Sequence, residues 1–402
     1  MENEAITALV LARGEVYYGT GFGAPAPLAE ELPANEHAEE SLRSVGEVVF
    51  NTAMSGYGEV LTDPSYTGQI VVMTYPHAGN YGIDESWSET GPEEGRSTGE
   101  RRIKPAGMVV RSLYDGPVPW GRITLADYLR ANGVPGITDL DTRALTLDLR
   151  DHGSGNGVIC RPSDGRVLTD TEYERAVSWS RAFPAMEGRS LIGAVGTTQP
   201  VHIPGESGPG EDPGPHLALY DCGTKANIIR ELLTHGCSLT LMPATATAEE
   251  IRETGAQAIL LSNGPGDPAV LSHQVEQTRK LLDVMPILGI CLGHQIVAEA
   301  VGAKTYKMKF GHHGVNHPVR EEVVPSGRER GRVFVTSQNH GFAVEEQTLP
   351  AGMQVWFRNA NDGSVEGLWD ESRRIRTTQF HPESAPGPGD SQWIFSAFLE
   401  GI

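Results

Sequence analysis

The sequence predicts an α/β protein in which a mixed, strand-rich α/β domain precedes a doubly wound parallel-sheet domain. A chain of 402 residues exceeds the size of one ordinary hydrophobic core. A stretch rich in proline and glycine interrupts it at residues 199–216, and short apolar segments alternate with helical periodicity beyond that stretch. The predicted domains are therefore residues 1–198 and 217–402, joined by a linker too polar to order itself by burial.

The first domain is predicted to be rich in strands. Two segments, Ala5–Ala12 and Glu15–Thr20, flank Arg13-Gly14 and predict a β-hairpin. Further strands are expected at Glu47–Phe50, Gln69–Thr74 and Gly107–Ser112.

Two helices are also expected in the first domain, each opening at a residue type that favours a helix N-cap. Thr124 is expected to cap a helix that ends near Gly133, and Asp141 is expected to cap a leucine-rich helix. The charged segment Glu30–Ser44 has no periodic pattern, and we interpret it as a surface insertion.

The second domain is predicted to alternate strands and helices, an order typical of a parallel sheet covered on both faces. The predicted strands are short and apolar: Leu217–Tyr220, Ser238–Met242, Ala258–Leu261 and Ile287–Ile290. The predicted helices follow them in turn: Asn227–Thr234, Ala248–Glu253, Gln274–Asp283 and His294–Val301. In such sheets, ligands bind beyond the carboxyl ends of the strands.

Composition argues against several classes of function. The formal net charge of −20 would repel nucleic acids and anionic membranes. No apolar run approaches the ~20 residues of a membrane span, and the first residues lack the basic region of a signal peptide. The four cysteines are scattered without zinc-like spacing, as in proteins of reducing compartments. We therefore expect a cytoplasmic protein with free thiols and with no nucleic-acid or membrane partner.

Cys291 stands out among the cysteines by its position. It follows the apolar strand Ile287–Ile290 and precedes a helix, and Gly289-Ile-Cys-Leu-Gly293 has the spacing of the G-x-S-x-G nucleophile elbow. The glycines allow the close backbone approach of a sharp turn. We expect the turn to expose the sulfur at the edge of the sheet, where the helix N-terminus favours the thiolate. A buried structural cysteine between two glycines that allow close packing would give the same sequence of residues.

A thiol nucleophile needs a base, and the base needs an orienting group. His381 precedes Pro382, which restricts it to an extended conformation. In an extended chain His381 and Glu383 project to the same side, so the carboxylate can favour the protonated imidazole. A histidine that only packs at a strand end is the alternative.

A glycine-rich loop directly follows the predicted strand Ala258–Leu261. It reads Ser-Asn-Gly-Pro-Gly-Asp-Pro at residues 262–268, and its N–H groups, with that of Leu292, can face a developing oxyanion. An ordinary tight turn is the alternative, because Asn-Gly and Pro-Gly are common turn dipeptides. The chain contains no phosphate loop of the G-x-x-x-x-G-K-[ST] type.

The second domain resembles the class I (triad-type) glutamine amidotransferases in three ordered motifs. They are SNGPGDP at 262–268, GICLGHQ at 289–295 and QFHPE at 379–383. The whole chain resembles the small-subunit family of carbamoyl-phosphate synthases. That likeness rests on FNTAMSGYGEVLTDPSY at 50–66, KFGHHGVNHPV at 309–319 and QNHGFAV at 338–344.

The resemblance implies that the chain hydrolyses L-glutamine to glutamate and ammonia through a glutamyl thioester. Cys291 would be the nucleophile, His381 the acid and base, and Glu383 its orienting group. The positions that match the family's glutamine-binding and oxyanion-binding residues are Ser65, Gly264, Gly266, Leu292, Gln295, Asn339, Gly341 and Phe342. From the sequence alone, Ser65 is better explained as a cap or turn residue.

The resemblance also implies a partner. Nothing in the sequence resembles an ATP site, yet making carbamoyl phosphate from bicarbonate requires ATP. A large synthase subunit would carry ATP and a divalent metal and receive the ammonia through a dry passage. The first domain would close part of the glutamine pocket and contact that subunit, and the product would serve arginine synthesis, pyrimidine synthesis or both.

No cofactor and no metal are expected on this chain. His312, His313 and His317 are close in sequence, but their spacing is no better than chance for a metal site. Three other functions remain open: the amidotransferase component of another synthase, such as one making anthranilate or guanylate; a cysteine peptidase on a similar sheet; and a catalytically silent subunit. The 50–66 motif argues against the first of these.

Overall fold

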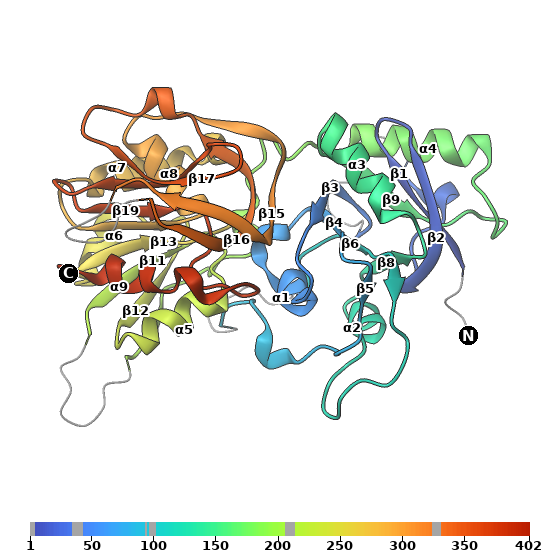
Figure 1. Ribbon diagram of the computed structural model, residues 1–402, viewed down its shortest axis with the longest axis horizontal. Coiled ribbons are helices and arrows are strands. Elements are labelled where there is room, and N and C mark those ends of the chain that lie inside the picture. Colours follow the sequence, from blue (N-terminus) through green and yellow to red (C-terminus); the bar gives the residue numbers. More distant parts are fainter. Residues whose placement is uncertain (1–4, 34–42, 93–94, 96–101, 206–213, 324–330) are drawn as a thin grey trace. The chain divides into compact units, whose positions relative to one another are not determined.

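A computed structural model describes residues 5–33, 43–92, 95, 102–205, 214–323 and 331–402 (Figure 1). The chain forms two compact units. The first comprises Met1–Ser88, Arg101–Arg189 and Lys309–His313; the second comprises Glu89–Glu100, Ser190–Met308 and Gly314–Ile402. The segment that begins at Glu89 thus belongs with the second unit, although it lies well inside the predicted first domain.

The predicted linker contains ordered structure at its start. Val201–Ile203 forms strand β10, which pairs antiparallel with β12 (Ser238–Pro243). Residues 206–213 of the predicted linker lie outside the described residues, as does most of the predicted insertion Glu30–Ser44.

Seven strands of the first unit close into a barrel in the order β1-β2-β8-β6-β4-β3-β9. Their bounds are β1 Ile6–Leu11, β2 Val16–Gly23, β3 Val45–Asn51, β4 Gln69–Met73, β6 Gly107–Val109, β8 Pro135–Thr138 and β9 Gly155–Cys160. The predicted hairpin is confirmed, because β1 pairs antiparallel with β2. Apolar side chains from several strands fill one buried cluster, including Leu9, Val48, Ile70 and Ile137.

The predicted strand Gly107–Ser112 is divided in the structure. β6 ends at Val109, and Ser112–Leu113 forms β7, which pairs with β5 (His77–Ala78) in a separate two-stranded sheet. Within the described residues, the α-helices of this unit are α1 Tyr57–Thr62, α2 Leu125–Ala131, α3 Thr142–His152 and α4 Asp170–Ala182.

Both predicted helix caps are confirmed. Thr124 accepts the N–H of Asp127 at 3.1 Å, and Asp141 accepts the N–H of Ala144 at 3.0 Å. Helix α4 was not predicted, although Thr169 and Glu172 form a capping box at its start.

The second unit is built on a ten-stranded sheet in the order β10-β12-β11-β13-β14-β19-β18-β17-β15-β16. The remaining strands are β11 His216–Asp221, β13 Ala258–Leu261, β14 Ile287–Ile290, β15 Thr305–Glu321, β16 Val333–Val344, β17 Gln354–Asn359, β18 Val365–Asp370 and β19 Ile375–Thr378. The five strands from β12 to β19 run parallel, as predicted. The sheet continues beyond β19 with antiparallel strands that were not predicted.

Helices cover both faces of the parallel strands (Figure 1). The helices are α5 Ala226–Thr234, α6 Ala248–Glu253, α7 Ser272–Leu281, α8 Leu292–Ala300 and α9 Trp393–Leu399. Alternate residues of β11 enter different cores: Ala218 and Tyr220 pack with side chains of α6, α7 and α8, whereas Leu217 and Leu219 pack with those of α5 and α9. The doubly wound arrangement is therefore confirmed. None of the helices in the described ranges has the length and apolarity needed to cross a bilayer.

Candidate active site

The turn from β14 to α8 forms a nucleophile elbow. Cys291 is the N-cap of α8 and has φ 54° and ψ −107°, in the left-handed half of conformational space where side chains are strained. A Cβ on Gly289 would lie 2.9 Å from the Gly293 carbonyl carbon, and a Cβ on Gly293 would meet the Leu261 carbonyl oxygen. The two glycines therefore let α8 pack directly against the sheet, as the motif predicts.

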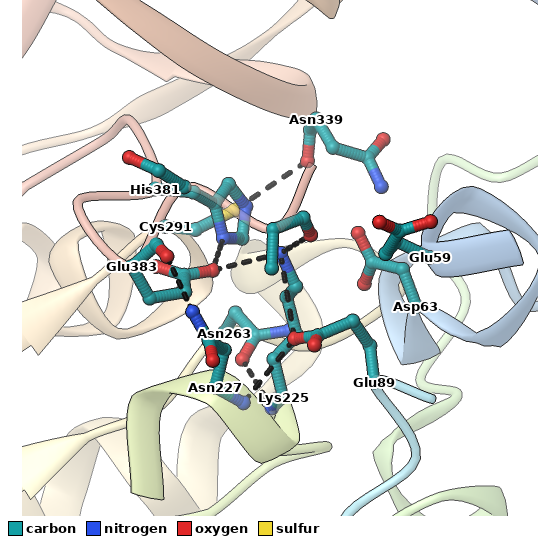
Figure 2. Close-up of polar contacts among 12 residues, drawn as sticks. Glu59, Asp63, Glu89, Lys225, Asn227, Asn263, Cys291, Asn339, His381 and Glu383 are labelled. Atoms are coloured by element: carbon teal, nitrogen blue, oxygen red, sulfur yellow. Dashed lines mark hydrogen bonds and ion pairs between the residues drawn. The ribbon is translucent and has the colours of Figure 1, made fainter. Parts of the chain in front are cut away.

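The predicted exposure of the sulfur was wrong. Cys291 is only 2% exposed, and its sulfur lies 3.5 Å from the Asn339 carbonyl oxygen (Figure 2). The long strand β16, which was not predicted, supplies Asn339 and covers the carboxyl end of the sheet at this point. A buried thiol is shielded from oxidants in the solvent.

His381 and Glu383 meet beside this turn. The Nδ1 atom of His381 and the Oε1 atom of Glu383 are 2.7 Å apart, and both side chains are buried. The His381 N–H donates to the Ser337 carbonyl oxygen at 2.9 Å, which holds its backbone against β16. Pro382 and Glu383 form a turn rather than the extended chain we expected, and Ser384 closes that turn with φ 56°. The two side chains still converge.

The imidazole of His381 favours its protonated form. Burial alone would lower its pKa, but the Glu383 carboxylate and Cys291 raise it to about 10. The Nε2 atom has no fully formed hydrogen bond among the described residues, although the imidazole is close enough to Cys291 to interact with it electrostatically. Nucleophile–base contacts of this loose kind are common in unliganded sites and tighten when substrate binds.

Lys225, which the sequence analysis did not single out, is a third partner of this pair. Its Nζ atom lies 2.9 Å from Oε1 of Glu383 and donates to the Ala385 carbonyl oxygen at 2.5 Å (Figure 2). Burial would raise the pKa of Glu383, but Lys225 and then His381 lower it, so the carboxylate stays ionised between two cations. Asn227 donates its side-chain N–H to the Glu383 carbonyl oxygen at 2.6 Å.

A second carboxylate, that of Glu89, also lies near Lys225. Glu89 Oε2 lies 3.8 Å from Nζ of Lys225, and the side chains of both residues are only 1% exposed. Sequence reasoning missed this contact because 136 positions separate the two residues and no local pattern links them. The one available signal was a lysine five positions after a predicted buried strand, in Cys222-Gly-Thr-Lys225.

The structure brings most of the predicted glutamine-binding residues together around Cys291. Gln295 donates its side-chain N–H groups to Phe342 O at 2.8 Å and to Gln379 Oε1 at 2.9 Å, so its Oε1 acceptor is the atom left to face a ligand. Gly341 lies between Asn339 and Phe342 on β16. Phe342 also packs under the ammonium group of Lys307, 5.0 Å from its ring centre.

The predicted oxyanion donors also lie side by side. Leu292 opens α8, whose first amides have no acceptor in a preceding turn. Gly264 follows β13, and a Cβ placed on it would lie 3.0 Å from a methyl group of Leu292. Gly266 has φ 105° and forms a bridge to Ser190. The positions of Gly264 and Leu292 are consistent with their N–H groups donating to an oxyanion at the carboxyl end of the sheet.

Ser65 belongs to the first compact unit. It lies in the 3-10 helix Pro64–Tyr66, where its N–H donates to the Asp63 carboxylate at 2.9 Å. Ser65 is thus a residue of this turn, and Asp63 is the residue that caps it.

The other three cysteines are core residues. Burial raises the pKa of the Cys160 thiol to about 12 and of the Cys237 thiol to about 11, and it raises that of Cys222 further still. These thiols therefore remain protonated near neutral pH, as expected for small apolar side chains in a core.

Gly293→Ala tests whether close packing at the elbow is needed. The added methyl group would meet the backbone of β13, so we expect the free energy of unfolding to fall by about 1–3 kcal/mol or more. Denaturant titration measures this change. Gly193→Ala is the matched control, because a Cβ there meets nothing within 4 Å. Equal stabilities of the two variants would show that the elbow tolerates a side chain.

Comparison with known proteins covers nearly the whole chain. Residues 218–400 match the family model of glutamine amidotransferase class-I, and residues 9–159 match that of the carbamoyl-phosphate synthase small chain, CPSase domain. The chain is 43% identical over 389 residues to a carbamoyl phosphate synthase small chain of Symbiobacterium thermophilum, with 96% of each chain covered. It is 40% identical over 407 residues to that of Pseudomonas aeruginosa, covering 98% of this chain and 97% of the relative.

Among solved structures, the chain has a more distant likeness. A glutamine amidotransferase from Thermotoga maritima is 21% identical to this chain, with a TM-score of 0.34. The match covers 43% of this chain and 77% of that one.

Proposed function

The chain belongs to the carbamoyl phosphate synthase small chain family, and from this premise we propose that Cys291, His381 and Glu383 hydrolyse L-glutamine. Membership makes the chain the glutamine amidotransferase subunit of that enzyme. The observation that carries the proposed residue roles is the contact between His381 and Glu383 at 2.7 Å beside a cysteine on a strained elbow.

In the first half of the reaction, the Cys291 thiolate attacks the side-chain amide carbon of glutamine. The carbonyl oxygen takes the negative charge, and the N–H groups of Gly264 and Leu292 stabilise it, each contributing about 2.7–4 kcal/mol in comparable sites. His381 then donates its Nε2 proton to the amide nitrogen, because Glu383 holds Nδ1. The C–N bond breaks, ammonia leaves, and a γ-glutamyl thioester remains on Cys291.

In the second half, neutral His381 accepts a proton from water as that water attacks the thioester. The C–S bond breaks, glutamate leaves, and the sulfur and the imidazolium return to their starting charges. The position of Gln295 supports a role in substrate binding. With both of its N–H groups occupied, it offers only an acceptor, which suits the α-ammonium group of glutamine.

The ammonia is used by a large subunit in this proposal. Family membership implies that subunit, which would bind ATP, bicarbonate and a divalent metal and make carbamoyl phosphate. Ammonia released into water becomes ammonium and loses its nucleophilicity, so a dry passage between the subunits of a cytoplasmic heterodimer is expected. Carbamoyl phosphate would enter arginine synthesis, pyrimidine synthesis or both, and this chain would need no cofactor or metal of its own.

Substrate choice is the direct test of this function. Purified chain, alone and with the large subunit, is incubated with glutamine or with unstructured peptides. We expect glutamate and ammonia from glutamine and no peptide cleavage. Peptide cleavage without glutamine hydrolysis would instead support the peptidase interpretation, and inactivity on both substrates would support a silent subunit.

Glu383→Ala should weaken glutamine hydrolysis without abolishing it. Without the carboxylate, His381 loses the group that fixes its tautomer, and Lys225 lies buried beside it without its closest counter-charge. We expect kcat/KM to fall by roughly 10²–10⁴-fold. The matched control is Glu371→Ala, at an exposed turn position of the same unit. A kcat/KM within twofold of wild type for Glu383→Ala would contradict the orienting role.

A further inference from the structure

A line of alternating charges runs from the nucleophile toward the surface. His381 contacts Glu383, Glu383 contacts Lys225, and Lys225 lies 3.8 Å from Glu89 (Figure 2). The line ends at Arg230 on α5, whose Nη1 atom is 3.3 Å from Oε1 of Glu89. The first four side chains are buried, whereas that of Arg230 is 47% exposed. Charges buried in this way persist only when they are paired.

Backbone contacts fix Glu89 at the start of α5. Its carbonyl oxygen accepts the N–H of Ala226 at 3.0 Å, and its carboxylate accepts the N–H of Asn227 at 3.3 Å. Thr90 forms a β-bridge with Lys225. A carboxylate is well suited to this place, because the first N–H groups of a helix carry a partial positive charge. Glu89 is therefore held in one position rather than swinging toward solvent.

We propose that Glu89 is a positioning residue of the triad. Its negative charge offsets the buried positive charge of Lys225, so that the Glu383 carboxylate can stabilise the protonated imidazole of His381. The inference rests on the function proposed above and goes beyond it. Lys225 holds the Glu383 carboxylate in place, but its positive charge also opposes that carboxylate's attraction for the imidazolium. The carboxylate of Glu89, 3.8 Å from Nζ of Lys225, offsets much of that positive charge, while the contact between Lys225 and Glu383 remains.

The pKa values of Glu89 and His381 define the pH range in which Glu89 affects the imidazole. Burial raises the pKa of Glu89 to about 7, against the opposing effect of Lys225, while Glu383 adds to the rise and Arg230 reduces it. The pKa of His381 is raised to about 10, so Glu89 is ionised throughout the range in which His381 titrates. Below pH ~6 Glu89 is protonated, and its influence on His381 disappears. The remaining acid of α5 nearby, Glu231, also has its pKa raised by burial and by Glu383.

The test compares Glu89→Gln with Glu89→Asp in the full chain. Glutamine keeps the size and the acceptor for Asn227 but removes the charge, whereas aspartate keeps the charge and shortens the side chain. We expect Glu89→Gln to lower the pH at which His381 titrates by about one unit, from Coulomb's law at an effective dielectric of about 20. Glu89→Asp should shift it by much less. Arg230→Gln should shift it upward, and by less than one unit because its side chain is half exposed and screened.

Two measurements read the shift independently. Protein with isotope-labelled histidine gives the titration of His381 by NMR, and the signal of His381 is assigned from its absence in His381→Asn. This measurement does not require the enzyme to turn over. The pH profile of glutamine hydrolysis gives the second. Above pH ~10, kcat/KM of Glu89→Gln should fall about tenfold below wild type, and the two should coincide near pH 6.

The outcomes separate the inference from the function on which it rests. An unshifted His381 titration in Glu89→Gln, with glutamine hydrolysis intact in wild type, would overturn only the role of Glu89. If Glu89→Gln does not fold, Arg230→Gln decides, and the absence of an upward shift there overturns the proposal. A wild-type chain that does not hydrolyse glutamine would refute the proposed function, while the NMR titration would still test the link between Glu89 and His381.

Discussion

Replacing Cys291 with serine is expected to abolish glutamine-dependent synthesis of carbamoyl phosphate while synthesis from added ammonium continues. A hydroxyl group at this position is a much poorer nucleophile than a thiolate, and the loss of a triad nucleophile typically costs roughly 10³-fold or more. Ammonium bypasses this chain, because its nitrogen enters at the large subunit. Both rates are measured on the reconstituted complex at saturating substrate.

The ammonium-dependent rate is the internal control for this experiment. Cys291→Ser changes one atom at a strained turn, so a complex that still uses ammonium has kept its fold and its assembly. Cys237→Ser is the matched variant, since that thiol is a buried core group on the same unit. Loss of both activities in Cys291→Ser would mean that Cys291 is a structural residue.

Replacing His381 with asparagine is expected to reduce glutamine hydrolysis almost as strongly. Asparagine can still donate a hydrogen bond toward Glu383, but it cannot hold and release a proton during the reaction. Both halves of the reaction depend on that proton, so we expect kcat/KM to fall by roughly 10³-fold or more. Single-turnover glutamate release is the measurement.

His202 provides a matched control for His381→Asn. His202 lies on the same sheet with an exposed side chain, so His202→Asn should leave the rate unchanged. Cys291 in His381→Asn should also be alkylated more slowly, because no imidazole remains beside its sulfur to accept the thiol proton. A His381→Asn variant that keeps more than a tenth of the wild-type kcat/KM would contradict the acid–base role.

The features that the sequence predicted correctly are local ones. The elbow needs a strand, a cysteine and a helix in succession, with glycines two residues before and after the cysteine, and all of these lie between Ile287 and Ala300. The caps at Thr124 and Asp141 are local in the same sense, because a single side chain bonds an amide three residues away. Short-range chemistry of this kind can be read directly from the order of residues.

The features that the sequence missed depend on contacts between distant segments. The antiparallel strands β15 to β18 were missed because their residues do not alternate strictly between apolar and polar, and their pairing depends on the partner strand. The Asp362-Gly363 turn between β17 and β18 was an available signal of a hairpin that was not used. One consequence is the burial of Cys291, because β16 supplies the backbone that covers it. The exposure we expected from the elbow alone was wrong for this reason.

The charge line behind the triad is non-local as well. A lysine and a glutamate in separate parts of the chain are each expected at the surface, where such residues usually lie. Only the fold reveals that Lys225 and Glu89 are buried together behind Glu383. His381 and Glu383, by contrast, are two residues apart, so their pairing could be predicted even though their backbone forms a turn.

Covalent labelling by a chloroketone analogue of glutamine tests the central claim most directly. The full chain, with and without the large subunit, is treated with the analogue and each of the four cysteines is examined by peptide mapping. The mechanism predicts one label per chain on the Cys291 sulfur and slower labelling when glutamine is present. A label on Cys160, Cys222 or Cys237, or labelling of Cys291 that glutamine does not slow, would contradict it.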